Sequence, residues 1–297
     1  MDAKQRRKLV ERHRVVDGKD FRLKRCATDD RAGLNNSKQE MADLLREGVE
    51  RLSAIQDKLY AQDRWAVLCI FQAMDAGGKD GAIKHVFSGL NPQGCHVTSF
   101  KAPTSLELDH DFLWRHVADL PARGMIGIHN RSWYEEVLIA RVHPEVLARQ
   151  KLPPEMRARK RLFDERLEDI AAFERYLARQ GVLILKFFLH LGKDEQRRRF
   201  LARIEEPEKN WKFSAADVAE RRRWDAYQDA YEAAIRATAA PHAPWYVVPA
   251  DSKPFARLAV SVALSEALEG LDLRYPQLDE VERAALEEAR EALVAEE

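Results

Sequence analysis

Short apolar runs recur along the chain and are separated by segments with helical spacing. The runs predicted as strands cover residues 65–71, 95–100, 125–129, 182–190 and 245–249. The run at 65–71 is apolar throughout, which is typical of a strand that is buried on both faces. Because helices are expected between these strands, the pattern predicts an α/β fold with a parallel sheet.

Helical spacing of apolar residues marks the segments between these runs. Ser37 followed by Glu40 is a capping-box signature that precedes a helix with leucines on one face. Trp224, Tyr227 and Tyr231 also recur at helical spacing, and we interpret them as core residues rather than as a base-stacking platform. Further helices are expected at residues 81–90, 105–120, 132–142, 157–180, 193–203 and 255–268 and in the Glu-rich tail from 279.

Composition excludes several classes of protein. The 297 residues carry 49 basic and 49 acidic side chains, so the formal net charge of zero identifies no charged partner. Cys26, Cys69 and Cys95 are scattered without metal-ligand spacing, which fits a reducing compartment. No apolar run approaches the roughly 18 residues that span a bilayer, and the basic N-terminus lacks the apolar segment of a secretory signal. We therefore expect a cytoplasmic protein that binds neither membranes nor nucleic acid.

A glycine-rich turn follows the first apolar run. Gly77, Gly78 and Gly81 surround Lys79 within residues 73–81. Glycines let backbone N–H groups approach phosphate oxygens, and the start of a helix favours negative charge. The segment predicts a phosphate-binding loop, with a strand-to-helix turn bearing a surface lysine as the alternative.

The loop matches the motif G-x-x-x-x-G-K-[ST] imperfectly. Ala73 replaces its first glycine, and Asp80 replaces the hydroxyl residue that usually holds magnesium. Asp75 adds a carboxylate inside the loop, which would repel phosphate unless a cation lies between them. Asp75 is therefore a candidate magnesium ligand, and a turn residue that bonds its own backbone is the alternative.

Polar residues also follow the third apolar run. Asn130 and Arg131 come directly after it, and ligands of open α/β sheets bind at the carboxyl ends of strands. Arg131 is a candidate for bidentate contact with a transferring phosphoryl group, with a surface arginine as the alternative. Glu135 lies one turn further on, where an acid would also simply stabilise a helix N-terminus.

Basic residues concentrate at 193–212, after the fourth apolar run. Arg199 and Arg203 are four residues apart and so share one helix face. A flexible basic arm that closes over a polyanion would exclude water from a transfer reaction. A solvated helix surface is the alternative interpretation of the same charges.

Several motifs occur in an order that resembles the second family of polyphosphate kinases. The loop Asp75-x-x-Gly78-Lys79-x-Gly81 is similar to the Walker A region of that family, and residues 130–135 are similar to its Walker B region. Further similar segments lie at residues 84–86, 91–94, 99–103, 195–200, 211–214, 224–232 and 244–246. The resemblance covers about residues 35–270 and leaves the tail outside.

The resemblance implies a fold and a domain organisation. The expected fold is a P-loop kinase-like three-layer α/β sandwich, similar to thymidylate kinase, with a five-stranded parallel sheet and a helical lid. We expect an N-terminal extension at residues 1–34 and the kinase domain at 35–270, with its lid at about 191–223. Residues 271–297 are expected to form an acidic helical tail.

The resemblance also implies an activity. The family transfers phosphoryl groups between inorganic polyphosphate and nucleotides with Mg²⁺, and we expect direct transfer without a covalent enzyme intermediate. Glu135 stands where members that also accept monophosphates have Glu, so both AMP and ADP are expected substrates, with GMP and GDP as further candidates. Asn130 stands where some members have Asp, which makes Asp75 more important as a metal ligand. We also expect a homo-oligomer.

The predicted site residues fall into groups by role. Asp75, Lys79 and Arg131 are the catalytic candidates, and Asp75 and Glu135 are the candidate metal ligands. Phosphate or nucleotide binding is assigned to Ala76, Gly77, Gly78, Asp80, Gly81, Lys101, Asn130 and Glu135. The polyphosphate-binding lid residues are Lys193, Arg199, Arg203 and Lys212.

Two other functions compete with this prediction. One is an ATP-dependent kinase of nucleotides or small metabolites, although the loop is not a standard ATP cradle. The other is a polyanion-binding module without catalysis, which would need stacking aromatics between its basic patches. The expected lid offers only Phe200, Trp211 and Phe213, and magnesium-dependent turnover would separate a module from an enzyme.

Overall fold

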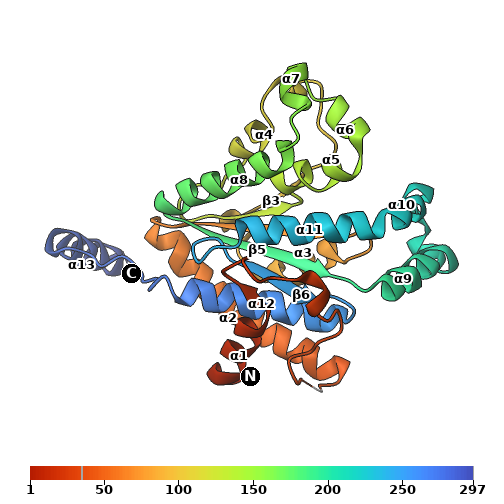
Figure 1. Ribbon diagram of the computed structural model, residues 1–297. Helices are drawn as coiled ribbons and strands as arrows, with labels where there is room; N and C mark the ends of the chain where they lie inside the picture. The colour runs from red at the N-terminus through yellow and green to blue at the C-terminus, as the bar shows by residue number, and fades with distance from the viewer. Residues whose placement is uncertain (35, 297) are drawn as a thin grey trace.

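The computed structural model describes residues 1–34 and 36–296. The start of the predicted kinase domain at residue 35 and the last residue of the predicted tail, 297, lie outside the described residues. Two layers of helices enclose a central sheet (Figure 1). The expected three-layer α/β sandwich is therefore confirmed.

One sheet of six strands forms in the described part of the chain, in the order β1-β6-β5-β2-β4-β3. Neighbouring strands from β6 to β3 are parallel, whereas β1 pairs antiparallel with β6 at the edge. The strands are β1 Arg14–Val15, β2 Ala66–Ala73, β3 Cys95–Ser99, β4 Ile126–Asn130, β5 Val182–His190 and β6 Trp245–Pro249. The five predicted parallel strands are confirmed, and the two-residue β1 from the N-terminal segment adds a sixth.

Helices cover both faces of the sheet. On one face lie α1 Ala3–His13, α2 Lys38–Gln62, α3 Lys79–Phe87 and α12 Lys253–Glu269 (Figure 1). The other face is covered by α8 Leu162–Arg179 and α11 Trp224–Thr238, with the short helices α4 Trp114–Val117, α5 Ile139–Val142, α6 Pro144–Ala148 and α7 Pro154–Arg157 above them. Helices α9 Lys193–Glu205 and α10 Ala215–Glu220 project to one side, and α13 Glu280–Val294 lies near the C-terminus.

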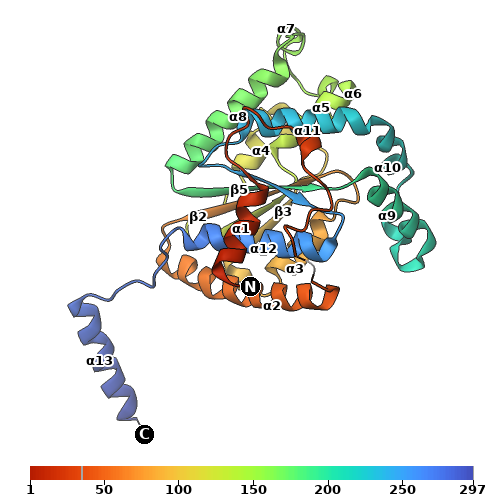
Figure 2. The same cartoon turned by 60° about the horizontal axis from the view of Figure 1, so that its bottom comes forward.

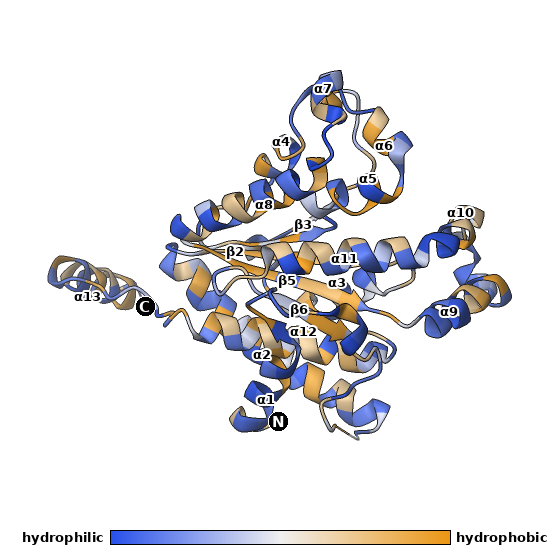
Figure 3. Ribbon diagram, in the orientation of Figure 1, coloured by the Kyte–Doolittle hydropathy of each residue, from blue (hydrophilic) through white to orange (hydrophobic). Residues whose placement is uncertain are grey.

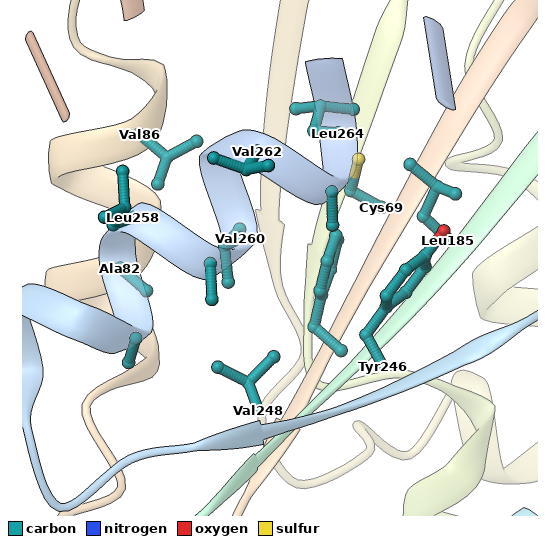
Figure 4. Close-up of a cluster of buried hydrophobic side chains, with 14 of the residues drawn as sticks. Cys69, Ala82, Val86, Leu185, Tyr246, Val248, Leu258, Val260, Val262 and Leu264 are labelled. Carbon is teal, nitrogen blue, oxygen red and sulfur yellow. The ribbon is translucent and has the colours of Figure 1, made fainter. Parts of the chain in front are cut away.

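Each face of the sheet has its own hydrophobic core. Val67, Cys69 and Phe71 of β2 point into one core, and Leu68 and Ile70 point into the other, as the alternation of a strand requires. Figure 4 shows side chains of α3 and α12 packed against those of β2, β5 and β6 in the first core. In Figure 3 hydrophobic residues concentrate in the strands, while α9 carries many hydrophilic residues. The uninterrupted apolar runs therefore form strands because both of their faces are covered.

The parallel strands end at one edge of the sheet. The last residues of β2, β3, β4, β5 and β6 are followed there by the segments at 74–78, 100–103, 131, 191–192 and 250–252. Segments that are far apart in the sequence thus come together where α/β sheets bind ligands.

Two predicted helices are wrong. Residues 105–120 form a short 3-10 turn at Glu107–Asp109 and the single turn α4 instead of one helix. Thr104 and Glu107 bond each other's backbone N–H groups, and Asp111 accepts from the N–H of Leu113, so local side-chain bonds interrupt the helical pattern. Residues 132–142 likewise divide into a 3-10 turn at Trp133–Glu136 and α5.

The two ends of the chain differ in how they contact the body. Leu9 and Val10 of α1 are buried in the first core, and β1 extends the sheet. Helix α13 stands away from the body in both views (Figure 2), and none of its described residues is buried. None of the helices in the described ranges is long and apolar enough to cross a bilayer.

Candidate active site

The turn between β2 and α3 has the backbone of a phosphate cradle. Gly78 precedes the helix at a φ of 97°, and Ala76 has a φ of 59°, so the turn uses two left-handed residues. A Cβ atom at Gly77 would approach Cβ of Ala73 to 2.5 Å and the carbonyl oxygen of Met74 to 2.8 Å. Glycine is therefore required at Gly77 by packing and favoured at Gly78 by its backbone angle.

Helix α3 begins at Lys79 with its first N–H groups available for an anion. Its N-cap, Gly78, has no side chain and makes no side-chain capping bond. The N–H groups of a first helical turn have no intrahelical acceptors, and the helix dipole adds partial positive charge. The turn can therefore bind phosphate oxygens through its backbone.

Lys79 lies inside this turn and points back toward the strand. Its Nζ donates to the carbonyl oxygen of Ala73 at 3.2 Å. Desolvation, and then the nearby charge of Arg131, lower the pKa of Lys79. A phosphate bound beside the ammonium would relieve both effects, because an anion favours the charged form.

Arg131 faces the turn from the end of β4. Its guanidinium lies 3.4 Å from a carboxylate oxygen of Glu135 and 4.0 Å from one of Asp75. The charge of Glu135 is the main cause that raises the pKa of Arg131. Arg131 remains 41% exposed, so its guanidinium is held by two acids and still accessible from the cavity.

Glu135 lies behind Arg131 rather than on the cavity wall. Its second carboxylate oxygen accepts a hydrogen bond from Nε2 of Gln72 at 2.9 Å, and its side chain is 16% exposed. Both oxygens are thus engaged by the protein. This placement connects Glu135 to Arg131, and the role of Glu135 as a metal ligand stays a prediction.

Asn130 connects the end of β4 to the start of α3. Its Nδ2 donates to Oδ1 of Asp80 at 2.7 Å, and Oγ of Ser99 lies at 3.5 Å. Asp80 occupies the position of the missing hydroxyl residue of the phosphate-loop motif. The amide of Asn130 therefore orients the carboxylate of Asp80 beside the loop.

Helix α9 is fastened to the phosphate loop at its base. Gln196 donates to the carbonyl oxygen of Asp75 at 2.9 Å, and Arg199 donates to that of Ala76 at 2.8 Å. Arg199 also donates to Glu195 and to the carbonyl oxygen of Ala250. The side chain of Arg199 is only 5% exposed, so this predicted lid residue braces the loop and its donors are already occupied.

These elements surround one open cavity of about 850 Å³. Of the predicted site residues, those that line it are Asp75, Ala76, Gly77, Gly78, Lys79, Asp80, Gly81, Lys101, Asn130, Arg131, Arg199, Arg203 and Lys212. Glu135 and Lys193 do not line it. Residues predicted from four separate segments of the sequence therefore meet at one site.

Five basic residues of the cavity wall were missing from the predicted site. They are Lys84, Arg198, Lys209, Lys253 and Arg257. Lys253 and Arg257 begin the helix after β6 and lie four residues apart, so the rule that ligands bind at strand ends would have identified them. With the predicted lysines and arginines they give the cavity a strongly cationic wall.

The acids of the cavity fit a metal that is held together with phosphate. Within the described residues, no group of three or more His, Cys, Asp and Glu side chains could hold an ion by itself. Asp75 and Asp80 do lie on the loop, and Mg²⁺ typically takes one or two carboxylates together with substrate phosphates and water. Nucleotide phosphates generally need a divalent metal, and these two carboxylates are the donors nearest the loop.

Comparison with known proteins identifies relatives along most of the chain. The family model described as Polyphosphate kinase 2 (PPK2) matches residues 35–276. An ADP-polyphosphate phosphotransferase of Rhodopseudomonas palustris is 55% identical over 258 residues, which cover 87% of this chain and 89% of that protein. An AMP/ADP-polyphosphate phosphotransferase of Meiothermus ruber is 46% identical over 268 residues, with 90% and 96% covered.

A solved structure has the same fold. The crystal structure of polyphosphate kinase 2 from Arthrobacter aurescens aligns with a TM-score of 0.86 at 40% sequence identity, and the alignment covers 97% of each chain. Sequence and structure comparisons therefore agree on one family.

Proposed function

The chain belongs to the polyphosphate kinase 2 family, and from this premise we propose how its cavity performs the reaction. It is an enzyme that transfers phosphoryl groups between polyphosphate and nucleotides. The observation that supports our assignment of the site is the cationic cavity around the loop 75–81. Such transfer needs little covalent chemistry from a protein, so positioning and charge neutralisation carry the catalysis.

Lys79 and Arg131 are proposed to stabilise the phosphoryl group in transit. The backbone N–H groups at the start of α3 would hold an adjacent phosphate, and Lys79 and Arg131 both line the cavity beside them. A planar guanidinium can bond two phosphate oxygens at once, while an ammonium acts as a point charge. Both charges oppose the negative charge that spreads over the moving group.

Transfer is proposed to be direct, without a phosphorylated enzyme residue. His129 is buried with its Nε2 directed at the carbonyl oxygen of Asp119, and Nδ1 of His85 lies 2.8 Å from the carbonyl oxygen of Gly81 in its own helix. His129 does not line the cavity, and His85 lines it with its Nδ1 already engaged within its own helix. The donor and acceptor phosphates therefore react with each other while the protein holds them.

Asp75 and Asp80 are proposed to hold Mg²⁺ together with the substrate phosphates. The ion would neutralise phosphate charge. It would also remove the repulsion between the phosphate and the carboxylate of Asp75 within the phosphate-binding loop. Glu135 contributes indirectly, because it bonds Arg131 and so sets the position of that guanidinium. This assigns Glu135 a different role from the metal ligand expected from the sequence.

The polyphosphate chain is proposed to lie along the basic wall formed by α9 and the start of α12. Arg203, Lys209 and Lys212 line the cavity from α9 and the turn after it, and Lys253 and Arg257 line it from α12. Basic side chains from several segments suit a linear polyanion better than a compact ligand. We propose residues 191–223 as the lid that covers this chain.

AMP and ADP are both proposed as acceptors, because relatives that match most of the chain are named ADP-polyphosphate and AMP/ADP-polyphosphate phosphotransferases. The test is a panel of AMP, ADP, GMP and GDP, each incubated with polyphosphate with and without Mg²⁺, with products identified by chromatography. We expect ATP from ADP and ADP from AMP, only with the metal. Binding of polyphosphate without turnover of any nucleotide would contradict the proposal.

Glu135→Asn tests the acceptor assignment separately. An amide bonds Arg131 more weakly than a carboxylate, so we expect turnover of AMP to fall by about tenfold relative to that of ADP. The matched control is Glu280→Asn on α13, which faces solvent and should leave the ratio unchanged. An unchanged ratio in Glu135→Asn would refute the role of Glu135 while leaving the ADP reaction intact.

A further inference from the structure

Arg131 lines the cavity and has a strained backbone. Its φ is 69°, in the left-handed region that residues with side chains rarely adopt. Such a conformation persists only when the surrounding structure over-determines it. The segment that begins at Arg131 must therefore be fastened firmly on both sides.

Two contacts hold the segment 131–134: a backbone hydrogen bond of Arg131 and the buried side chain of Tyr134. The N–H of Arg131 donates to the carbonyl oxygen of Phe71 on β2 at 3.0 Å. Three residues later Tyr134 enters the core beneath the sheet edge and is fully buried. Its hydroxyl lies 2.8 Å from Oε1 of Glu174 on α8 and 2.8 Å from Oγ1 of Thr238 on α11.

Lys186 completes this cluster from the middle of β5. Its Nζ donates to Oε2 of Glu174 at 2.5 Å, to the carbonyl oxygen of Thr238 at 2.8 Å and to the hydroxyl of Tyr134 at 3.1 Å. Lys186 is 0% exposed and Glu174 is 1% exposed. All three donors of the ammonium are thus used, which is the condition under which a buried charge is tolerated.

Stability alone does not account for an ion pair at this depth. Replacing a buried ion pair by apolar residues of similar volume is often neutral or stabilising. A hydrogen-bonded cluster also fixes the orientation of its side chains, because each hydrogen bond requires a particular distance and angle. The cluster fixes the hydroxyl of Tyr134 to α8, α11 and β5 simultaneously.

We propose that Lys186, Glu174 and Tyr134 are positioning residues for phosphoryl transfer, which hold the turn that presents Arg131 to the cavity. None of the three lines the cavity, so they act through Arg131 and not on the substrates. Glu135 follows Tyr134 directly and bonds both Gln72 and Arg131, so it links the cluster to the guanidinium. This inference rests on the proposed function of Arg131.

Tyr134→Phe is the first test, because it removes one hydroxyl and keeps the buried ring. With polyphosphate, ADP and Mg²⁺, we expect kcat to fall between about tenfold and about a hundredfold, since small misplacements of catalytic groups are costly. The KM values for both substrates should stay within about twofold, because the binding wall is untouched. An unchanged kcat in a folded variant overturns the proposal.

Ser265→Ala is the matched control. Ser265 is also buried, lies in α12 on the opposite face of the sheet, and donates to the carbonyl oxygen of Ser261 at 2.9 Å. The variant loses a buried hydrogen bond of the same kind, so its thermal stability should fall while its kcat is kept. An equal loss of kcat in both variants would mean that destabilisation alone explains the effect, which also overturns the proposal.

A double-variant comparison shows whether the effect passes through Arg131. In an Arg131→Ala background, Tyr134→Phe should lower the residual kcat no further, because the group that it positions is gone. If the two losses multiply, Tyr134 acts independently of Arg131 and the proposal fails. If Tyr134→Phe does not fold, Thr238→Val removes the neighbouring hydroxyl of the cluster and takes its place in both measurements.

Hydrogen exchange separates this inference from the proposed function. The amides of residues 130–136 should exchange faster in Tyr134→Phe than in the wild type, whether or not the protein turns over polyphosphate. A wild type without turnover would refute the proposed function, while unchanged exchange in this segment would refute the positioning role. The two failures therefore have different signatures.

Discussion

A buried histidine shows how a single residue near the site responds to its surroundings. His116 is fully buried, and neither of its ring nitrogens has a hydrogen-bond partner among the described residues. Its ring lies against Phe100, with the ring centres 4.2 Å apart, and against Trp133. Desolvation, and then the charges of Arg115 and His129, lower the pKa of His116 to about 2. The imidazole is therefore kept neutral in the folded protein.

This burial predicts a loss of stability in acid. The unfolded chain binds a proton at His116 below its ordinary pKa of 6.5, whereas the folded chain does not until about 2. The stability that His116 contributes is thus present above pH 6.5 and lost as the pH falls toward 2. Between pH 7 and pH 5 the loss is about 2 kcal/mol.

His116→Phe keeps an aromatic ring and removes the titration. Urea unfolding at pH 7 and pH 5 should show a smaller drop in the free energy of unfolding for the variant, by about 2 kcal/mol. The control is His110→Phe, since His110 is exposed and stacks on Trp114. Equal acid sensitivity of wild type and His116→Phe would show that another group controls the transition.

At the scale of elements, helix α9 has two parts with different roles. Its base is fastened to the phosphate loop through Gln196 and Arg199. Its far end and the following turn expose Leu201, Ile204 and Trp211, so this part is only lightly packed. Arg203 lies between the two parts, lines the cavity and pairs with Asp217 at 3.0 Å.

Arg203→Ala should weaken the use of polyphosphate more than the use of nucleotide. Loss of a charged hydrogen bond costs about 1.5–3 kcal/mol, so the KM for polyphosphate should rise by about tenfold or more while the KM for ADP changes little. The difference should shrink as salt is added, because screening weakens contacts to a polyanion. Kinetics across a salt series measure both effects.

Arg222→Ala is the control for this prediction. Arg222 is exposed in the same region and does not line the cavity. An equal rise of the KM for polyphosphate in both variants would indicate a general charge effect. No rise in Arg203→Ala at low salt would contradict the position of the polyphosphate chain along the lid.

Helices and strands were predicted well where burial determines the structure. They were predicted poorly where local side-chain hydrogen bonds determine it. The five parallel strands follow from apolar runs, because only strands covered on both faces tolerate such sequences. The segments 105–120 and 132–142 carry helical spacing, but side chains such as Thr104, Glu107 and Ser132 bond the nearby backbone and divide them into turns. The spacing of apolar residues gives no indication of such side-chain to backbone bonds.

The site was predicted to the extent that short motifs define it. The loop 75–81 and Asn130-Arg131 directly follow predicted strands. Their residue types and their positions at strand ends therefore both indicated a ligand site. The contacts of Arg199 with the loop could not be predicted from the sequence. They involve carbonyl oxygens of the loop and of residue 250, which lie near Arg199 only in the folded protein. The left-handed backbone of Arg131 was equally invisible, since no glycine marks it.

At the scale of the whole molecule, the catalytic body and the tail are separate. The phosphate loop, α3, α9 and α12 all contribute to the cavity, whereas α13 begins with its own capping box at Asp279 and buries none of its described residues. Helix α13 exposes Val281, Leu286 and Leu293. The stability of the body should therefore not depend on this helix.

Deletion of residues 279–297 tests that separation. The melting temperature should change by less than about 2 °C and kcat should be kept, because the helix supplies no core contact. Light scattering of both proteins would also give the oligomeric state, which stays a prediction here. A large fall in melting temperature or in molar mass would show that the tail packs against the body or a second copy.

The cavity around the phosphate loop is the proposed place of phosphoryl transfer from polyphosphate to nucleotide. The direct measurement is ATP formation from ADP, polyphosphate and Mg²⁺ by the wild type, by Lys79→Met and Asp75→Asn, and by the exposed control Lys4→Met. We predict ATP from the wild type and the control, and a loss of about a hundredfold or more in each loop variant. No ATP from the wild type, or wild-type rates from Lys79→Met, would contradict the account.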